Sequence, residues 1–328
     1  HILSEANHRL NYVEPWAEQR LQTLRGATGQ RVHPLDLSDD RLAAVLEALS
    51  DDVHWQAFEG AWTQQLLRVY DLQPERVRLD ATTASGYWRV TEDGLFQFGL
   101  SLDHRPDLPQ VKVMLSVLDP LGLPVATDIV PGQRADDPLY IPAIARVRES
   151  VGRRGLLYVG DCKMGTLETR AFIQAGGDAY LCPLAQAVLA YRSQYLVESD
   201  IGRLKGHPLS LTPMYLERDD HATGLIRLLS VGLRVLTLLE FVVRQRLAAA
   251  RTALTGLYAG NPKRATAHPT TERLLKRFEG LTLTIIREGR RWRSHLTPLS
   301  RVQRRILALL NFPVDIYTRL CPDSHEPP

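Results

Sequence analysis

The spacing of apolar residues changes near residue 74, and this change constrains the fold more than any other feature of the sequence. Before it, apolar residues over 42–49 recur at helical spacing after an Asp-rich start, and residues 55–70 continue a second amphipathic stretch. After it, residues 77–80 alternate with a period of two, as in a strand. We therefore expect a helical N-terminal region over residues 1–72 and a sheet beyond it.

Strand and turn signals then continue to about residue 184. The strand candidates are residues 77–80, 95–102, 110–118, 123–130, 156–159 and 179–184, with helices expected at 136–150 and 166–175 and a turn at 119–122. A short meander followed by alternating strand and helix units is typical of a mixed α/β sheet flanked by helices. The order also fits a ribonuclease H-like core, although periodicity alone does not select that fold over others.

The longest apolar stretch, residues 225–243, is interrupted by Arg227, Arg234 and Glu240. Charges are expensive at the centre of a membrane, so we expect a buried helix and no contact with a membrane. Three widely separated cysteines, none in a CxxC pair, argue against a disulfide scaffold or a zinc cluster and favour a cytoplasmic setting. The chain begins at His1, so we expect it to be a fragment or a processed product.

Charge is distributed unevenly along the chain. The net charge is +3, yet residues 244–305 carry fifteen Lys and Arg against three acids, about +12 in formal charge. Within this segment Arg290, Arg291 and Arg293 surround Trp292, and arginine forks bind phosphate well. We expect a basic helical C-terminal region over residues 244–328 that contacts DNA; the alternative is a solvated helical surface.

Three acids are candidates for chemistry. Asp80 and Asp161 each lie at the end of an expected strand, where ligand groups in open sheets often gather, although either could simply cap the next turn. Glu198 lies on one expected helix face with Tyr191, Gln194 and Lys205. The side chains on that face could contact an extended charged ligand, or they could form a partly solvated polar stripe. Another acid, Asp136, is interpreted as a helix cap rather than as a ligand.

Carboxylates from two strand ends and one helix can hold two Mg²⁺ ions, because hard cations prefer oxygen ligands. Paired metals activate the attacking oxygen and stabilise the leaving oxygen of a phosphoryl displacement. Such a set of carboxylates is compatible with metal-dependent phosphoryl transfer, beside the structural interpretations given for each acid.

The sequence resembles bacterial insertion-sequence transposases of the DDE type. The family's helix motif of Tyr, two residues, Arg, three residues, Glu, six residues and Lys is matched in spacing by Tyr191, Gln194, Glu198 and Lys205. Leu79–Thr83 and Tyr158–Met164 resemble the segments around the family's first and second catalytic Asp. The run Ser101–Val111, which contains Asp-His-Arg-Pro, resembles the signature that follows the second strand.

The resemblance implies a ribonuclease H-like catalytic core, here residues 73–243, that cuts at transposon ends and joins a DNA 3′-hydroxyl to target DNA. It implies Mg²⁺, with Mn²⁺ as an alternative, held by the catalytic residues Asp80, Asp161 and Glu198. Its partner would be double-stranded DNA, bound by a homodimer in the nucleoid. The DNA-contacting residues would be Tyr191, Gln194, Lys205, His104, Arg105, Lys163, Arg290, Arg291 and Arg293.

The chain departs from the family pattern in three places. Gln194 replaces the motif arginine, and Leu102 replaces a lysine. Asp161 and Glu198 are only 37 residues apart, where this family usually carries a β-rich insertion. Two alternatives therefore stay open, namely an inactive DNA-binding remnant of a transposase and a standalone Mg²⁺-dependent nuclease.

Overall fold

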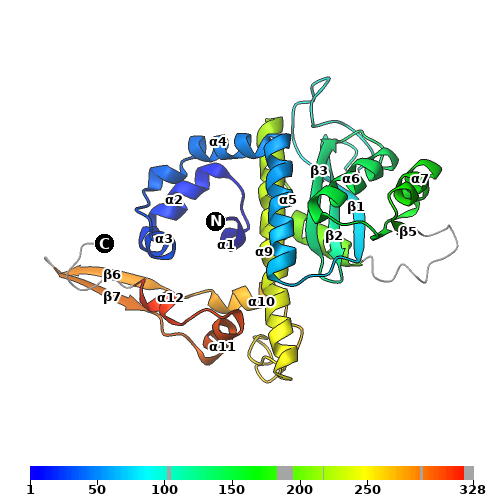
Figure 1. Cartoon of the computed structure of the whole chain (residues 1–328). Coiled ribbons are helices and arrows are strands. Elements are labelled where there is room, and N and C mark those ends of the chain that lie inside the picture. The colour runs from blue at the N-terminus through cyan, green and yellow to red at the C-terminus, as the bar shows by residue number, and fades with distance from the viewer. Residues whose placement is uncertain (102–104, 183–194, 217, 289–290, 321–328) are drawn as a thin grey trace. The chain divides into compact units, whose positions relative to one another are not determined.

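The computed structural model describes residues 1–101, 105–182, 195–216, 218–288 and 291–320 (Figure 1). The chain divides into two compact units. Unit 1 comprises residues 1–9 and 40–234, and unit 2 comprises residues 10–39 and 235–328. Each unit is described by itself.

Unit 1 is built on a five-stranded sheet in the order β3-β2-β1-β4-β5. Its strands are β1 (Arg76–Ser85), β2 (Gln110–Asp119), β3 (Leu123–Pro131), β4 (Leu157–Val159) and β5 (Ala179–Leu181). β1, β2 and β3 form an antiparallel meander, whereas β4 and β5 continue the sheet parallel to β1. This mixed order is that of a ribonuclease H-like fold, which confirms the predicted α/β class.

The central strands are buried along nearly their whole length, as expected for a sheet covered on both faces. α6 (Tyr140–Val151) packs against β2 and β3, and α8 (Tyr195–Lys205) packs against β1 and β2. The hairpin between β2 and β3 uses Gly122, whose φ of +73° favours glycine. The predicted turn at residues 119–122 is thereby confirmed.

Helices complete unit 1 and largely match the expected segments. They are α1 (Ile2–Glu5), α4 (Asp39–Ser50), α5 (Asp52–Val69), the 3-10 turns η3 (Asp137–Leu139) and η4 (Cys162–Gly165), α7 (Leu167–Ala175) and the first part of α9 (Asp219–Ala249). α7 begins where the Thr166 side chain accepts a hydrogen bond from the Thr169 amide at 3.2 Å. α6 ends at Gly152, which has a left-handed φ of +67°.

The predicted strand at residues 95–102 is wrong over its described part, residues 95–101. Only Gln97 forms a bridge there, with Gln110 at the start of β2. The Leu95 amide instead donates to the Asp219 carboxylate at 2.7 Å. At Gly99 a Cβ atom would lie 2.5 Å from the Gly132 carbonyl oxygen, so this segment packs tightly against a loop rather than extending the ladder.

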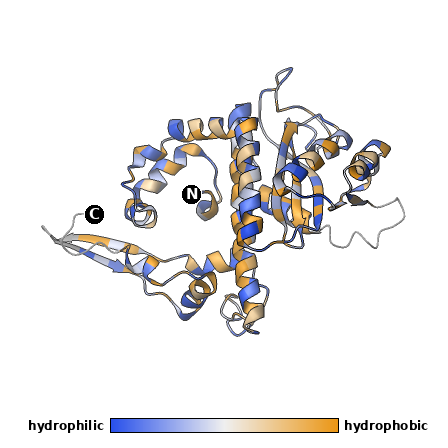
Figure 2. Cartoon of the chain, viewed as in Figure 1, coloured by the Kyte–Doolittle hydropathy of each residue, from blue (hydrophilic) through white to orange (hydrophobic). Residues whose placement is uncertain are grey.

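The charges within the apolar stretch of α9 are paired inside the protein. Arg234 is fully buried, and its Nη2 lies 2.6 Å from Oε1 of Glu59, which is 1% exposed. The second oxygen of Glu59 pairs with Arg146, which also reaches Asp128 at 2.8 Å. Figure 2 shows hydrophobic and hydrophilic residues side by side along α9. No helix of the described residues is both long and apolar enough to cross a bilayer.

Unit 2 is mostly helical, with one hairpin that the sequence analysis did not anticipate. Its helical elements are η1 (Leu10–Tyr12), α2 (Val13–Glu18), α3 (Leu21–Thr28), η2 (Pro34–Leu37), the rest of α9, α10 (Thr271–Leu275), η6 (Lys276–Phe278), α11 (Arg301–Leu310) and α12 (Asp315–Thr318). The antiparallel hairpin is β6 (Leu283–Glu288) with β7 (Arg291–Leu296). β6 is rich in β-branched residues, which favour a strand over the helix expected there.

A separate apolar core holds unit 2 together. Its buried members come from the end of α9, the following loop, α10 and α11: Val243, Leu247, Leu254, Leu257, Leu274, Ile306 and Leu309. α11 begins with a capping box, in which Ser300 Oγ accepts from the Gln303 amide and Gln303 Oε1 accepts from the Ser300 amide. These local signals place α11 so that its apolar face closes the core.

Candidate active site

Asp80 and Asp161 are brought together by the parallel register of β1 and β4. Arg78 on β1 lies opposite Val159 on β4. Asp80 lies two residues after Arg78, and Asp161 lies two residues after Val159. The two aspartates therefore occupy matching positions on neighbouring segments of the chain. Asp161 follows the end of β4, as predicted, whereas Asp80 lies in the middle of β1 opposite Leu115 of β2, so its predicted place at a strand end is wrong.

Glu198 joins this pair from α8, which packs on β1 and β2. The electrostatics of Asp80 show the proximity of all the acids. The pKa of Asp80 is raised to about 6, mainly by burial and further by the charges of Asp161, Glu198 and Asp136, against the lowering effect of a hydrogen bond from the Ala81 amide. Like charges gathered around a buried carboxyl disfavour its ionised form. The structure therefore unites the three predicted acids and adds a fourth.

Asp161 is held in a fixed orientation by two hydrogen bonds to the same oxygen. Its Oδ1 accepts from the Lys163 amide at 3.0 Å, which caps η4, and from the Tyr140 hydroxyl at 2.6 Å. Burial, followed by the hydrogen bond and charge of Asp161, raises the pKa of Tyr140, so the phenol stays a donor at neutral pH. Within the described chain, Oδ2 of Asp161 accepts no hydrogen bond and is available to a ligand.

Asp136 bridges two lysines beside these acids. Its two carboxylate oxygens accept from Lys112 Nζ and Lys163 Nζ, and Lys112 also donates to the Arg134 carbonyl at 2.5 Å. Burial alone would raise the pKa of Asp136, but these lysines outweigh it and lower the pKa. Asp136 lies at the N-cap position of η3, as predicted, although its side chain makes no capping hydrogen bond.

Sequence reasoning missed Tyr140, Lys112 and the role of Asp136. Lys112 offered a usable signal, because a charged residue inside the apolar run of β2 must find a buried partner. Tyr140 offered none, since its hydroxyl reaches Asp161 only through the packing of α6 against the sheet.

The acids suit hard divalent cations. Carboxylates are the oxygen ligands that Mg²⁺ prefers, and a cation would offset the charges of Asp161, Glu198 and Asp136 that contribute, after burial, to the raised pKa of Asp80. The oxygens of Asp80, Asp161 and Glu198 do not all lie within 4.8 Å of one another; among described residues only Glu47, Asp220 and His221 do so.

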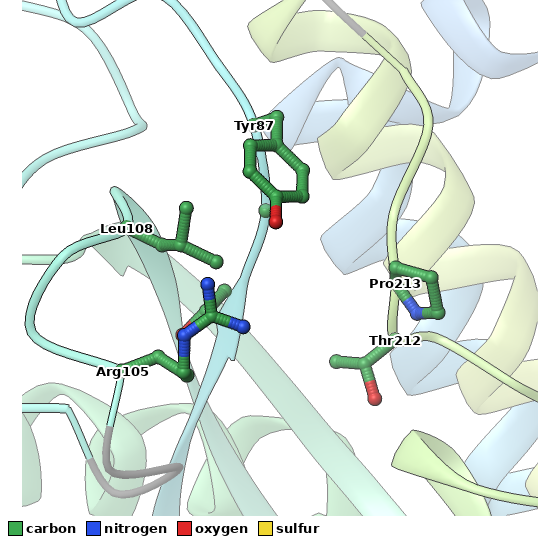
Figure 3. A pocket seen from close by; sticks show the side chains of 7 residues that line it. Tyr87, Arg105, Leu108, Thr212 and Pro213 are labelled. Carbon is green, nitrogen blue, oxygen red and sulfur yellow. The ribbon is translucent and has the colours of Figure 1, made fainter.

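The other predicted DNA contacts are dispersed. Arg105 forms a two-pronged pair with Asp107, at 2.8 and 2.7 Å, on the rim of a pocket of about 270 Å³ lined also by Tyr87, Leu108 and Thr212 (Figure 3). Asp107 offsets the charge that Arg105 would offer to a phosphate. The predicted contacts His104, Tyr191, Gln194 and Arg290 lie outside the described residues.

Four further predicted contacts lie within the described residues. Lys163 pairs with Asp136 and keeps 38% of its side chain exposed. Lys205 lies in the last turn of α8, seven residues after Glu198. Arg291 and Arg293 lie on β7 rather than on a helix, and Arg293 is exposed.

No protein-family model and no curated protein matches the chain. Among solved structures it is similar to the piggyBac transposase synaptic complex with hairpin DNA, with 8% identity, a TM-score of 0.37 and coverage of 84% of this chain and 76% of that one. It is also similar to the Mos1 transposase paired-end complex with left transposon end (10% identity, TM-score 0.25) and to the Mos1 strand transfer complex (14%, 0.28), each covering 70% of this chain and 79% of that one. The fold assignment rests on strand order and register.

Proposed function

We propose that the chain is a DNA transposase that cuts at transposon ends and joins the freed 3′-hydroxyl to target DNA. One observation carries the proposal: Asp80, Asp161 and Glu198 converge from β1, the end of β4 and α8 of a ribonuclease H-like sheet, and their charges act on one another. The motif spacing of Glu198 and Lys205 and the basic segment at residues 244–305 support DNA as the substrate.

The three acids would hold Mg²⁺ or Mn²⁺, which when bound activates the attacking oxygen and stabilises the leaving oxygen. Tyr140 would help to orient Asp161, because its hydroxyl donates a hydrogen bond to Oδ1 of that carboxylate. Asp136 holds the Lys163 ammonium at the edge of this site, where its exposed part can donate to a DNA phosphate. Lys205 and the arginines on β7 would contact the DNA backbone farther along.

The partner we propose is double-stranded DNA, bound by a homodimer in a cytoplasmic, nucleoid-associated setting. Two transposon ends must be held together for joining, which is the physical reason for a dimer. Each Lys or Arg that neutralises a phosphate adds a salt-dependent term to the affinity, so binding should weaken steeply with salt.

The deciding experiment follows a labelled, pre-cut duplex that carries the terminal inverted repeat found beside the coding sequence. In Mg²⁺, the wild-type chain should join this duplex to a plasmid, and Asp161→Asn should not. A chain that nicks plasmid DNA but never joins the duplex would be a nuclease. A chain that binds the duplex and neither nicks nor joins would be an inactive remnant.

A further inference from the structure

Unit 2 contains a basic pocket that none of the predicted site residues line. Its volume is about 510 Å³, and it opens between the loop at residues 256–264 and the segment formed by α10 and η6. Four cationic side chains line it, and no acid does: Arg264, Arg273, Lys276 and Arg277. Such a gathering of like charge is unfavourable unless an anion fills it.

Tyr258 organises two of these cations. The guanidinium carbons of Arg264 and Arg273 each lie 4.3 Å from the centroid of its ring. The ring itself is half-buried and packs against the apolar core of unit 2. Because arginines stacked on an aromatic face lose less freedom when they bind, this arrangement holds two phosphate donors ready.

The loop that carries Arg264 is closed at its base. Leu254 and Thr266 exchange two backbone hydrogen bonds, and the Gly256 amide donates to the Pro262 carbonyl at 3.0 Å. The Arg264 amide donates to both the backbone and side-chain oxygens of Asn261. The wall of the pocket is therefore fixed by the backbone before any ligand arrives, which reduces the entropic cost of binding.

The cations of the pocket have no carboxylate partners within the described chain. Arg277 Nη1 donates to the Gly256 carbonyl at 3.2 Å, whereas its buried Nε meets no acceptor among those residues. Arg264, Arg273 and Lys276 are exposed to solvent. Exposed and uncompensated cations along an open rim suit a chain of phosphates better than they suit an enclosed small anion.

We propose that this pocket binds a backbone phosphate of double-stranded DNA, at a site separate from the arginines of β7. The inference rests on the proposed DNA-binding function and is independent of the chemistry at the carboxylates. It assigns the first phosphate contact to Arg273 and Lys276 from one wall, with Arg264 held opposite by Tyr258.

The test measures binding of a fluorescent 30-base-pair duplex to the full chain in EDTA, over a series of salt concentrations. Arg273→Gln/Lys276→Gln should weaken binding about tenfold at 0.1 M salt and lower the slope of log K against log salt by about 0.9, since each neutralised phosphate contributes about 0.9 and these two cations share one phosphate. Lys263→Gln/Arg251→Gln is the matched control, because it removes two exposed cations of unit 2 that do not line the pocket. We expect the control to bind within about twofold of wild type.

A second pair of variants tests the role of the ring. Tyr258→Phe keeps the aromatic face and should preserve affinity, whereas Tyr258→Leu should lower it several-fold; circular dichroism would confirm that both fold. Equal losses in the pocket and control variants, an unchanged salt slope, or a wild-type chain that does not bind DNA would each overturn the inference. If pyrophosphate raises the melting temperature through these residues while the DNA slope is unchanged, the site is a small-anion site and the inference is wrong. If Arg273→Gln/Lys276→Gln lowers the slope of log K against log salt as expected, but the wild-type chain does not nick DNA, only the proposed catalytic function fails.

Discussion

Asp80 and Asp161 lie on adjacent parallel chains, each two residues beyond the Arg78–Val159 pair of β1 and β4. Parallel register therefore sets two carboxylates side by side without any contact that the sequence alone would reveal. Glu198 from α8 adds a third charge, and together they raise the pKa of a largely buried Asp80 whose main perturbation is burial itself. The fold holds this charge at a cost to its own stability.

Replacing Asp80 with Asn should stabilise the metal-free chain while abolishing activity. The folded-state pKa of about 6 lies above the usual value of an aspartate, so the folded state binds this proton more tightly than the unfolded state does. The stabilisation from protonation is complete below pH 4 and is lost as pH rises through about 6. At pH 7, the Asp80→Asn substitution removes the free-energy cost of keeping Asp80 ionised in the folded state. This cost is up to about 3 kcal/mol, at roughly 1.4 kcal/mol per pKa unit.

Urea unfolding of both chains in EDTA at pH 7 and pH 4.5 measures this effect. The difference in the free energy of unfolding between Asp80→Asn and wild type should be larger at pH 7 than at pH 4.5. Glu149→Gln, an exposed neutralisation on α6, should show no such difference. A variant no more stable than wild type at pH 7 would show that keeping Asp80 ionised does not destabilise the folded chain.

Nicking at limiting Mg²⁺ should fall as pH drops below about 6, because metal ligands must be deprotonated. Bound metal favours the ionised form of Asp80, so raising Mg²⁺ should move the midpoint of the pH profile to lower pH. Initial rates across pH 5–8 at two Mg²⁺ concentrations test this linkage. A midpoint that does not respond to Mg²⁺ would assign the titration to another group.

Tyr140→Phe should weaken metal-dependent activity without unfolding the chain. The hydroxyl donates to Asp161 Oδ1 at 2.6 Å, and loss of a group that orients a metal ligand typically costs about 10–100-fold in metal affinity. The apparent Mg²⁺ requirement for nicking should therefore rise, and excess Mg²⁺ should restore much of the rate. Tyr158→Phe, which removes a buried hydroxyl that makes no hydrogen bond to Asp161, is the control. Equal Mg²⁺ requirements in the two variants would show that Tyr140 does not position Asp161.

Glu59→Ala should destabilise unit 1 by about 3–5 kcal/mol, because it leaves buried Arg234 without its partner. Replacing both residues, as Glu59→Met/Arg234→Met, should cost less than Glu59→Ala alone, since no unpaired charge remains between them. Chemical denaturation gives both values. Additive losses would indicate that the pair is not coupled.

Much of unit 1 could be predicted from its sequence, because its strands carry strong local signals. Residues 110–118, 123–130 and 156–159 were placed correctly, since unbroken apolar runs between turn residues allow few other structures. Asp80 and Asp161 were singled out as candidate site residues from the sequence, but their juxtaposition depends on the parallel register of β1 and β4, which no local pattern specifies.

The errors occurred where tertiary contacts outweigh local pattern. Residues 95–101 look like a strand, but close packing at Gly99 keeps them outside the ladder. Asp136 lies at the predicted N-cap position, yet its side-chain oxygens accept hydrogen bonds from Lys112 of β2 and Lys163 of η4 and not from a helix amide. The hairpin at residues 283–296 was not predicted, because the sequence was interpreted there by its arginines and a helical region was expected.

Nicking of supercoiled plasmid DNA in Mg²⁺ by a matched set of variants tests the central claim most directly. The set is wild type, Asp80→Asn, Asp161→Asn, Glu198→Gln and the exposed-acid control Glu149→Gln. We predict that the first three variants each lose at least about a thousandfold in rate, with no further loss on combination because the acids act as one unit. The control should match wild type. Wild-type rates in Asp80→Asn or Glu198→Gln would contradict the assignment of these acids to a shared metal site.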